Sequence, residues 1–110
     1  MSGDSGHEFN DWCAEVVEWH KAAFPTETME QLGLCLGEES GELQRTILKE
    51  SHGANDRRAD WDWRTERAAE IGDVMISLAC IAERDGVDLM AVLWARFDYV
   101  SKRFPVAIAD

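Results

Sequence analysis

Residue types that cross-link a chain or break its helices are scarce among these 110 residues. The three cysteines, Cys13, Cys35 and Cys80, are an odd number without short spacing, which argues against a disulfide framework and a cysteine-ligated zinc site. We expect all three to be buried free thiols. With only two prolines, Pro25 and Pro105, long helices can run uninterrupted between them.

Basic residues are scarce as well, with 11 Lys and Arg against 22 Asp and Glu and a net charge of −11. A surface this negative repels a phosphate backbone, so we expect no nucleic-acid partner. No apolar run approaches the roughly 20 residues that span a bilayer, so no membrane association is expected. The first residues lack the basic and apolar regions of a signal peptide, and a cytoplasmic location is therefore expected.

The apolar positions recur at helical spacing, and no stretch alternates as a β-strand does. We predict an all-α fold of four helices, with room for a short fifth turn, in a single domain over residues 8–110 behind a flexible segment at residues 1–7. The segment 53–63 has no period and reads as a loop. The predicted helices and their signals are Phe9–Ala23, ended by Pro25; Glu27–Ser51, capped by Thr26 or Thr28; Thr65–Asp85, closed by Gly86; and Leu89–Arg103, capped by Asp88.

The second predicted helix carries carboxylates within its apolar stripe. At about 100° per residue, Glu39 falls inside the apolar sector and Glu38 and Glu42 flank it. A carboxylate in a core stripe costs several kcal/mol unless it is compensated. The sector itself is formed by Met29, Leu32, Leu36, Leu43 and Ile47.

The third predicted helix is apolar nearly all round over residues 71–82, which indicates a central, buried helix. Asp73 is the only charge in that stretch, and Glu70 lies three residues earlier, on the same side. Glu39 and Glu42 have the same spacing, so two antiparallel helices would bring four carboxylates together. Their mutual repulsion would raise their pKa values. A hard divalent cation resolves this conflict, and oxygen ligands favour magnesium or manganese.

Two other interpretations compete with a metal site. In the first, Glu39 and Asp73 are neutralised by buried arginines, for which Arg45, Arg67 and Arg96 are the candidates. In the second, the helices form a ferritin-like di-iron bundle, which requires Glu-x-x-His pairs. That bundle is excluded, because none of the three histidines, His7, His20 and His52, follows a glutamate of either cluster at that spacing.

The two motifs Glu38-Glu39-x-x-Glu42 and Glu70-x-x-Asp73, in this order, closely resemble those of the MazG-like all-α nucleoside triphosphate pyrophosphatases. The resemblance extends from about Trp19 to Pro105. It implies hydrolysis between the α and β phosphorus, giving a monophosphate and pyrophosphate. It also implies a homodimer or homotetramer with sites near the subunit interfaces.

The resemblance also implies roles for individual residues. Glu39, Glu42, Glu70 and Asp73 take the positions of the metal ligands, and Glu38 that of a residue that orients or deprotonates the attacking water. On the last helix, Arg96 stands where the family usually has Lys, and Asp98 where it usually has Asn. Asp98 is expected to contact ribose hydroxyls or base rather than phosphate. The predicted substrate-binding residues are Arg96, Asp98, Lys102 and Arg103.

The leading hypothesis is thus a magnesium-dependent nucleotide pyrophosphohydrolase that serves housecleaning of the nucleotide pool. One alternative is a helical interaction or regulatory protein whose metal site is structural. Another is a related phosphoribosyl-ATP pyrophosphohydrolase. Arg57 and Arg58 in the predicted loop lie where they could close over phosphates, although solvated loop charges are the simpler reading. Trp61 and Trp63 suit either base stacking or packing.

Overall fold

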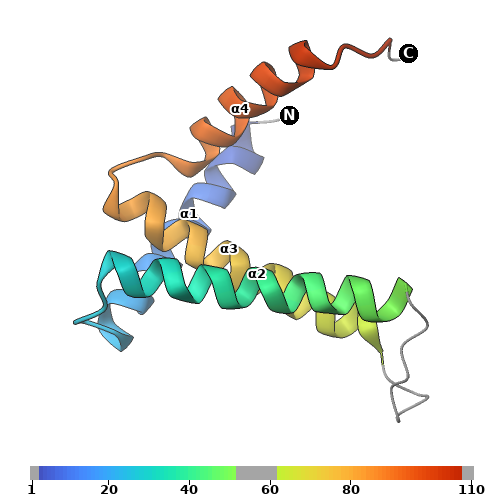
Figure 1. Cartoon of the computed structure of the whole chain (residues 1–110). Coiled ribbons are helices and arrows are strands. Elements are labelled where there is room, and N and C mark those ends of the chain that lie inside the picture. The colour runs from blue at the N-terminus through green and yellow to red at the C-terminus, as the bar shows by residue number, and fades with distance from the viewer. Residues whose placement is uncertain (1–2, 52–61, 108–110) are drawn as a thin grey trace.

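The computed structural model describes residues 3–51 and 62–107, with side chains from His7 onward. In these ranges the chain forms four α-helices and no strand, which confirms the predicted all-α class (Figure 1). The predicted loop residues Arg57, Arg58 and Trp61 lie outside the described residues. The helices are α1, Gly3–Ala23; α2, Met29–Ser51; α3, Trp63–Arg84; and α4, Leu89–Arg103.

The first helix begins earlier than expected. α1 starts at Gly3 rather than near Phe9, so the segment predicted as a flexible lead-in, residues 1–7, is helical from residue 3 on. The prediction relied on apolar periodicity, which begins only at Phe9. A first helical turn that carries no apolar residue gives no such periodic signal.

The turn between α1 and α2 is closed by side chains on both of its sides. The Thr28 amide donates to Gln31 Oε1 at 2.7 Å, and the Gln31 amide donates to Thr28 Oγ1 at 3.1 Å. This reciprocal capping box identifies Thr28, rather than Thr26, as the cap of α2. Across the turn, His20 Nε2 in the last turn of α1 lies 3.1 Å from Glu27 Oε1.

The ends of α3 and α4 follow the turn chemistry of the sequence. The Asp62 carboxylate accepts from the amides of Arg64 and Thr65 at 3.0 and 3.2 Å, so α3 begins two residues before the predicted Thr65. Gly86 adopts a φ of +66°, a conformation that only glycine takes without strain, and ends α3 as predicted. Asp88 then caps α4 by accepting from the Ala91 amide at 3.0 Å.

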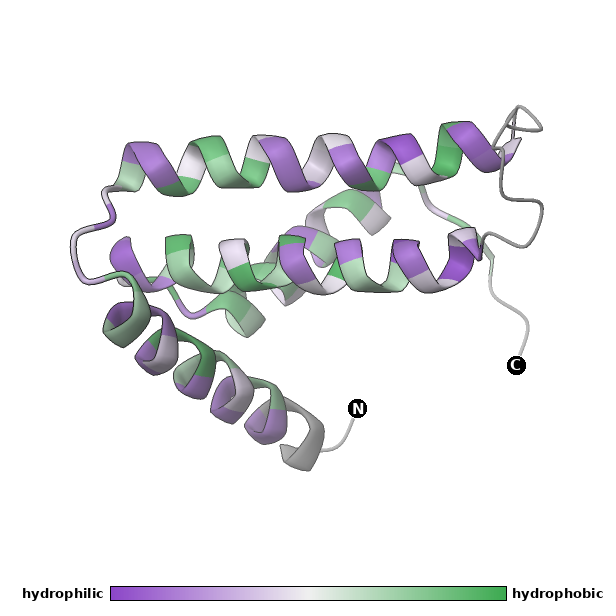
Figure 2. Cartoon of the chain, turned by 90° about the horizontal axis from the view of Figure 1, so that it is seen from below, coloured by the Kyte–Doolittle hydropathy of each residue, from purple (hydrophilic) through white to green (hydrophobic). Residues whose placement is uncertain are grey.

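The core lies where α1, α2 and α3 meet. α2 and α3 run antiparallel side by side, and α3 also packs on α1 (Figures 1 and 2). The predicted central position of α3 is confirmed, but its predicted burial all round is wrong. Two neighbouring helices cover only part of its circumference, and Ile71 is 49% exposed. The buried apolar residues are Val17, Leu32, Ala79 and Cys80, with Cys13, Ile81 and Leu89 packed against them.

Of the predicted apolar stripe on α2, only Leu32 is fully buried, while Met29 and Ile47 are exposed. α3 protects one side of a helix of 23 residues, and the ends of the stripe extend past the core. The three cysteines are free as expected, yet only Cys80 is buried and the other two are half-buried. Within the described residues no helix is long and apolar enough to cross a membrane.

The last helix stands apart from the α2–α3 pair. α4 packs against α1 and extends away from the other two helices (Figure 1). None of its residues is buried. The radius of gyration of the chain is 17.2 Å, against about 13 Å for a compact domain of this length. The chain is therefore more extended than an isolated globular domain.

Candidate metal centre

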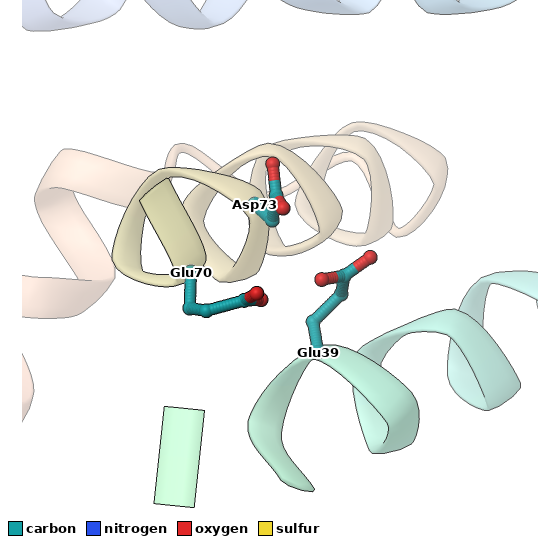
Figure 3. Close-up of side chains that lie close together, drawn as sticks. All are labelled: Glu39, Glu70 and Asp73. Carbon is teal, nitrogen blue, oxygen red and sulfur yellow. The ribbon is translucent and has the colours of Figure 1, made fainter. Parts of the chain in front are cut away.

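Three carboxylates from two facing helices converge at one point. Glu39 projects from α2, and Glu70 and Asp73 project from adjacent turns of α3 toward it (Figure 3). One oxygen from each side chain lies within 4.8 Å of the others. The spacing of three residues places Glu70 and Asp73 on one side of α3, and the antiparallel pairing with α2 brings Glu39 opposite them. Glu39, Glu70 and Asp73 therefore lie together, as the sequence predicted.

The carboxylates perturb one another. Burial, the charge and hydrogen bonding of Glu42, and the charges of Glu39 and Asp73 raise the pKa of Glu70 to about 7. The pKa of Glu39 is raised as well, by burial and by the charges of Asp73 and Glu42. Glu70 Oε2 is buried and accepts no hydrogen bond from the described residues. A buried carboxylate oxygen without a donor costs free energy until a cation or proton compensates it.

No side-chain cation of the described residues compensates this charge. Arg45 pairs with Glu66 and Arg67 with Glu50, while the Arg96 guanidinium lies 4.7 Å from the centre of the Tyr99 ring. Among the described residues no ion pair reaches Glu39, Glu70 or Asp73. The interpretation in which these three arginines neutralise the site is therefore not supported by the structure.

The remaining acidic residues of the motifs differ in their placement. Glu42 is exposed on α2 but lies close enough to Glu70 and Glu39 to raise their pKa values, so it forms a fourth carboxylate at the rim. Glu38 is exposed and is not one of the three that converge. Together with burial and the charge of Glu27, the Glu38 charge raises the pKa of the Cys35 thiol, one turn earlier on α2.

The expectation that Asp73 lies in apolar surroundings is wrong for the single chain. Asp73 is exposed, whereas Glu39 and Glu70 are half-buried. The cost of placing a charge in an apolar core thus applies in part to Glu39 and Glu70 and not to Asp73. Burial of Glu39 and Glu70, which is the largest cause of their raised pKa values, and repulsion among the adjacent carboxylates are the physical reasons for a cation.

The donor set fits a hard divalent cation. All available ligand atoms are carboxylate oxygens, the donors that magnesium and manganese prefer over nitrogen or sulfur. Magnesium holds its oxygens at about 2.1 Å, so opposite ligands lie about 4.2 Å apart. The ligand oxygens of Glu39, Glu70 and Asp73 all lie within 4.8 Å of one another. Small side-chain movements therefore suffice to bring the oxygens into coordination.

A hollow with aromatic walls lies one turn along α3 from Asp73. Its volume is about 380 Å³. Trp12 and Trp19, both on α1, are 38% and 57% exposed in the single chain. Their spacing along α1 was visible in the sequence, whereas their position beside Ile76 of α3 depends on tertiary packing. The hollow is lined by Trp12, Glu15, Val16, Trp19 and Ile76.

The predicted substrate-binding residues lie on α4, away from the carboxylates of their own chain (Figure 1). Lys102 Nζ donates a hydrogen bond to Asp98 Oδ2 at 2.9 Å, and the two side chains form an ion pair. The Arg103 guanidinium lies over the rings of Tyr99 and Phe104, at 5.8 and 5.4 Å from their centres. Within one chain the structure does not bring Arg96, Asp98, Lys102 or Arg103 to the carboxylates.

The tryptophan at the end of the predicted loop has a structural role. Trp63 is the first residue of α3, and the Arg45 guanidinium lies 5.8 Å from the centre of its ring. Because Arg45 belongs to α2, this contact joins the two helices that carry the carboxylates.

Searches of protein-family models, curated proteins and solved structures find no match to this chain.

Proposed function

We propose that Glu39, Glu70 and Asp73, with Glu42 at the rim, hold magnesium or manganese, and that the chain is a MazG-like nucleoside triphosphate pyrophosphohydrolase. The observation that carries this proposal is the convergence of three carboxylates on facing helices, with no ion pair to them from a basic side chain of the described residues. The order and spacing of the two motifs support the choice of reaction. The proposed role is housecleaning of the nucleotide pool.

In the proposed reaction, water attacks the α phosphorus and the bond to the bridging oxygen of the β phosphate breaks. The products are a nucleoside monophosphate and pyrophosphate, and the water proton is released. A bound divalent cation would neutralise phosphate oxygens and lower the pKa of water. The chain supplies the carboxylates that hold the cation. Glu38, exposed on the neighbouring surface of α2, is proposed to orient the water or accept its proton.

Two further surfaces are assigned in this proposal. The hollow beside Asp73 would take the base, since Trp12 and Trp19 offer exposed rings for stacking. Arg96, Lys102 and Arg103 would stabilise charge on the phosphates, with Asp98 contacting ribose or base. Because α4 stands away from the carboxylates of its own chain, these residues can act only when a second copy supplies them. The proposal therefore includes a homodimer or homotetramer.

The test is to incubate the protein with each nucleoside triphosphate and magnesium and to measure pyrophosphate and monophosphate. We expect turnover that chelation abolishes and that Glu39→Gln and Asp73→Asn reduce by about 100-fold or more, equivalent to about 2.7 kcal/mol of transition-state stabilisation. Glu30→Gln is the matched control, because Glu30 is an exposed glutamate in the first turn of α2. Unchanged turnover in Asp73→Asn would refute the site.

Substrate choice separates the alternatives. Turnover of phosphoribosyl-ATP without turnover of nucleoside triphosphates would identify the related pyrophosphohydrolase. If the protein bound magnesium, measured by calorimetry, but hydrolysed none of these substrates, the non-catalytic alternative would replace the enzyme.

A further inference from the structure

Arg67 of α3 carries a buried donor that no acceptor satisfies. Its Nε is buried and donates to no oxygen of the described residues. The same guanidinium pairs with Glu50 of α2, but through a terminal nitrogen. A buried N–H without an acceptor destabilises the folded chain, because it has lost its hydration and nothing replaces it. Such a group in a folded protein indicates that an acceptor is missing, and a ligand can supply one.

Arg67 lies one helical turn from Glu70, which has the opposite deficiency. Glu70 Oε2 is buried and accepts no hydrogen bond from the described residues, so the buried donor and the buried acceptor do not pair with each other. Residues three apart are neighbours on the helix surface, separated by about 4.5 Å along the axis. A ligand that brings a cation to Glu70 and an anionic oxygen to Arg67 satisfies both groups. A divalent cation bound to a phosphate has this composition.

The carboxylates of both helices are followed by an arginine at the same spacing of three residues. Because α2 and α3 run antiparallel, the two arginines lie beyond the same end of the carboxylate cluster (Figures 1 and 2). Their ion pairs, Arg45 with Glu66 and Arg67 with Glu50, both join α2 to α3 there. The facing surfaces of the two helices therefore change from acidic to basic within about one turn. The two series are Glu39, Glu42 and Arg45 on α2, and Asp73, Glu70 and Arg67 on α3.

The series on α3 continues in the other direction to Ile76, which lines the aromatic hollow. A row of residues three apart is inclined by about 45° to the helix axis. It therefore winds from the side of α3 that meets α2, at Arg67, to the side that meets α1, at Ile76. The nine residues between them span about 13.5 Å of helix. The order of basic side chain, carboxylates and aromatic hollow matches the order of terminal phosphates, α phosphate and base in a nucleoside triphosphate.

We infer that Arg67 binds the β and γ phosphates of the substrate, with Nε donating to a phosphate oxygen. The inference rests on the proposed function and deepens it, because it gives the substrate an orientation along α3. The terminal phosphates lie toward the start of α3, and the base lies toward Ile76 and the aromatic hollow. A guanidinium donates two parallel hydrogen bonds to a phosphate, which a single point charge does not. Unlike the basic residues of α4, Arg67 needs no second copy to reach the carboxylates.

Binding of inorganic pyrophosphate in the presence of magnesium, measured by calorimetry, tests this contact without turnover. Pyrophosphate carries the two phosphates that Arg67 is inferred to bind. Arg67→Gln should weaken its binding by about 10- to 100-fold, as expected for the loss of hydrogen bonds to a charged group. Arg67→Lys keeps the charge but loses the planar donors, and its affinity should fall between the two. Wild-type affinity in either variant, or a wild-type protein that binds no pyrophosphate, overturns the inference.

Two control variants separate this contact from other effects of Arg67. Lys49→Gln removes an exposed positive charge from the last turn of α2 and should leave the affinity unchanged, because solvent and salt screen exposed charges. Glu50→Gln breaks the ion pair but leaves the guanidinium, so this variant should bind pyrophosphate at least as tightly as the wild type. A loss in either control as large as that in Arg67→Gln overturns the inference, since general charge or helix packing would then explain it.

Turnover of nucleotides distinguishes failure of the inference from failure of the proposed function. If the wild type hydrolyses nucleoside triphosphates and Arg67→Gln binds pyrophosphate normally, the inference alone is wrong. If Arg67→Gln weakens pyrophosphate binding but the wild type hydrolyses no nucleotide, the phosphate contact stands and the pyrophosphohydrolase function is wrong.

Discussion

The α2–α3 pair and α4 both expose something that an isolated domain would neutralise, but what they expose differs. On the helix pair it is negative charge, since Glu39, Glu70 and Asp73 meet and pair with no basic side chain of the described residues. On α4 it is apolar surface, since Phe97 and its neighbours have no cover. Charge is satisfied by an ion, which is small and exchangeable. Apolar area is satisfied only by another large surface, so the two regions call for different partners.

The largest expected effect separates packing within the chain from packing between chains. Leu32→Ala removes a side chain that is 1% exposed in the core and should lower the free energy of unfolding by about 2–5 kcal/mol. Leu93→Ala changes an exposed residue and should lower it by under about 1 kcal/mol within one chain, while raising the dissociation constant of the proposed dimer. Chemical denaturation and sedimentation measure the two quantities. Equal losses of unfolding free energy in the two variants would remove the distinction between the regions.

The second prediction separates catalysis from stability at the helix pair. Glu70→Gln removes one negative charge from the cluster, so turnover should fall by about 100-fold or about 2.7 kcal/mol. The metal-free variant should nevertheless be more stable than the wild type, because repulsion with Glu39, Glu42 and Asp73 is relieved. Thermal denaturation in a chelator tests this sign. A less stable variant would show that the Glu70 charge is compensated in the metal-free protein.

The third prediction concerns pH. The pKa of Glu70 is raised from 4.5 to about 7 on folding, so the folded state holds this proton more tightly than the unfolded state. The corresponding stability is fully present below 4.5 and is lost as the pH rises toward about 7. Metal-free protein should therefore lose stability across this window, and magnesium should restore it above the window by binding the ionised cluster. Glu70→Gln should show a flatter profile, and an equally steep profile would contradict this assignment.

The smallest effects on stability are expected from the loss of two helix caps, one on α2 and one on α4. Thr28→Ala removes the cap of α2, and Asp88→Ala removes the cap of α4. Each should cost about 1 kcal/mol of helix stability. Amide hydrogen exchange should locate the first loss across α2 and its packed neighbour and confine the second to α4. Faster exchange throughout the chain in Asp88→Ala would mean that α4 is as tightly coupled to the core as α2.

The fold was largely predictable because its signals are local. Pro25, Gly86 and Asp88 mark helix ends through backbone chemistry that needs no tertiary contact, and the structure places those ends as expected. The start of α1 at Gly3 was missed, because apolar periodicity does not report a helical turn without apolar residues. Local signals therefore predicted which segments are helical better than where the first one begins.

The site was predictable only in part, for a related reason. The spacing of Glu70 and Asp73 fixes their common side of α3, and the antiparallel pairing with α2 brings Glu39 to them. Sequence periodicity cannot report how much of a helix its neighbours cover, so the exposure of Asp73 was not foreseen. It also cannot choose among partners for Arg45 and Arg67, whose ion pairs depend on long-range packing.

The order of the helices along the chain has a consequence for synthesis in the cell. Chains fold from the N-terminus as they are made, and the three helices that form the core and hold the carboxylates precede α4 in the sequence. The helices that carry the carboxylates are thus synthesised before the helix that carries the exposed apolar side chains. All ligands of the proposed cation site precede α4, whereas the contribution of α4 to a second copy, which the proposed function requires, can begin only once that helix has been made.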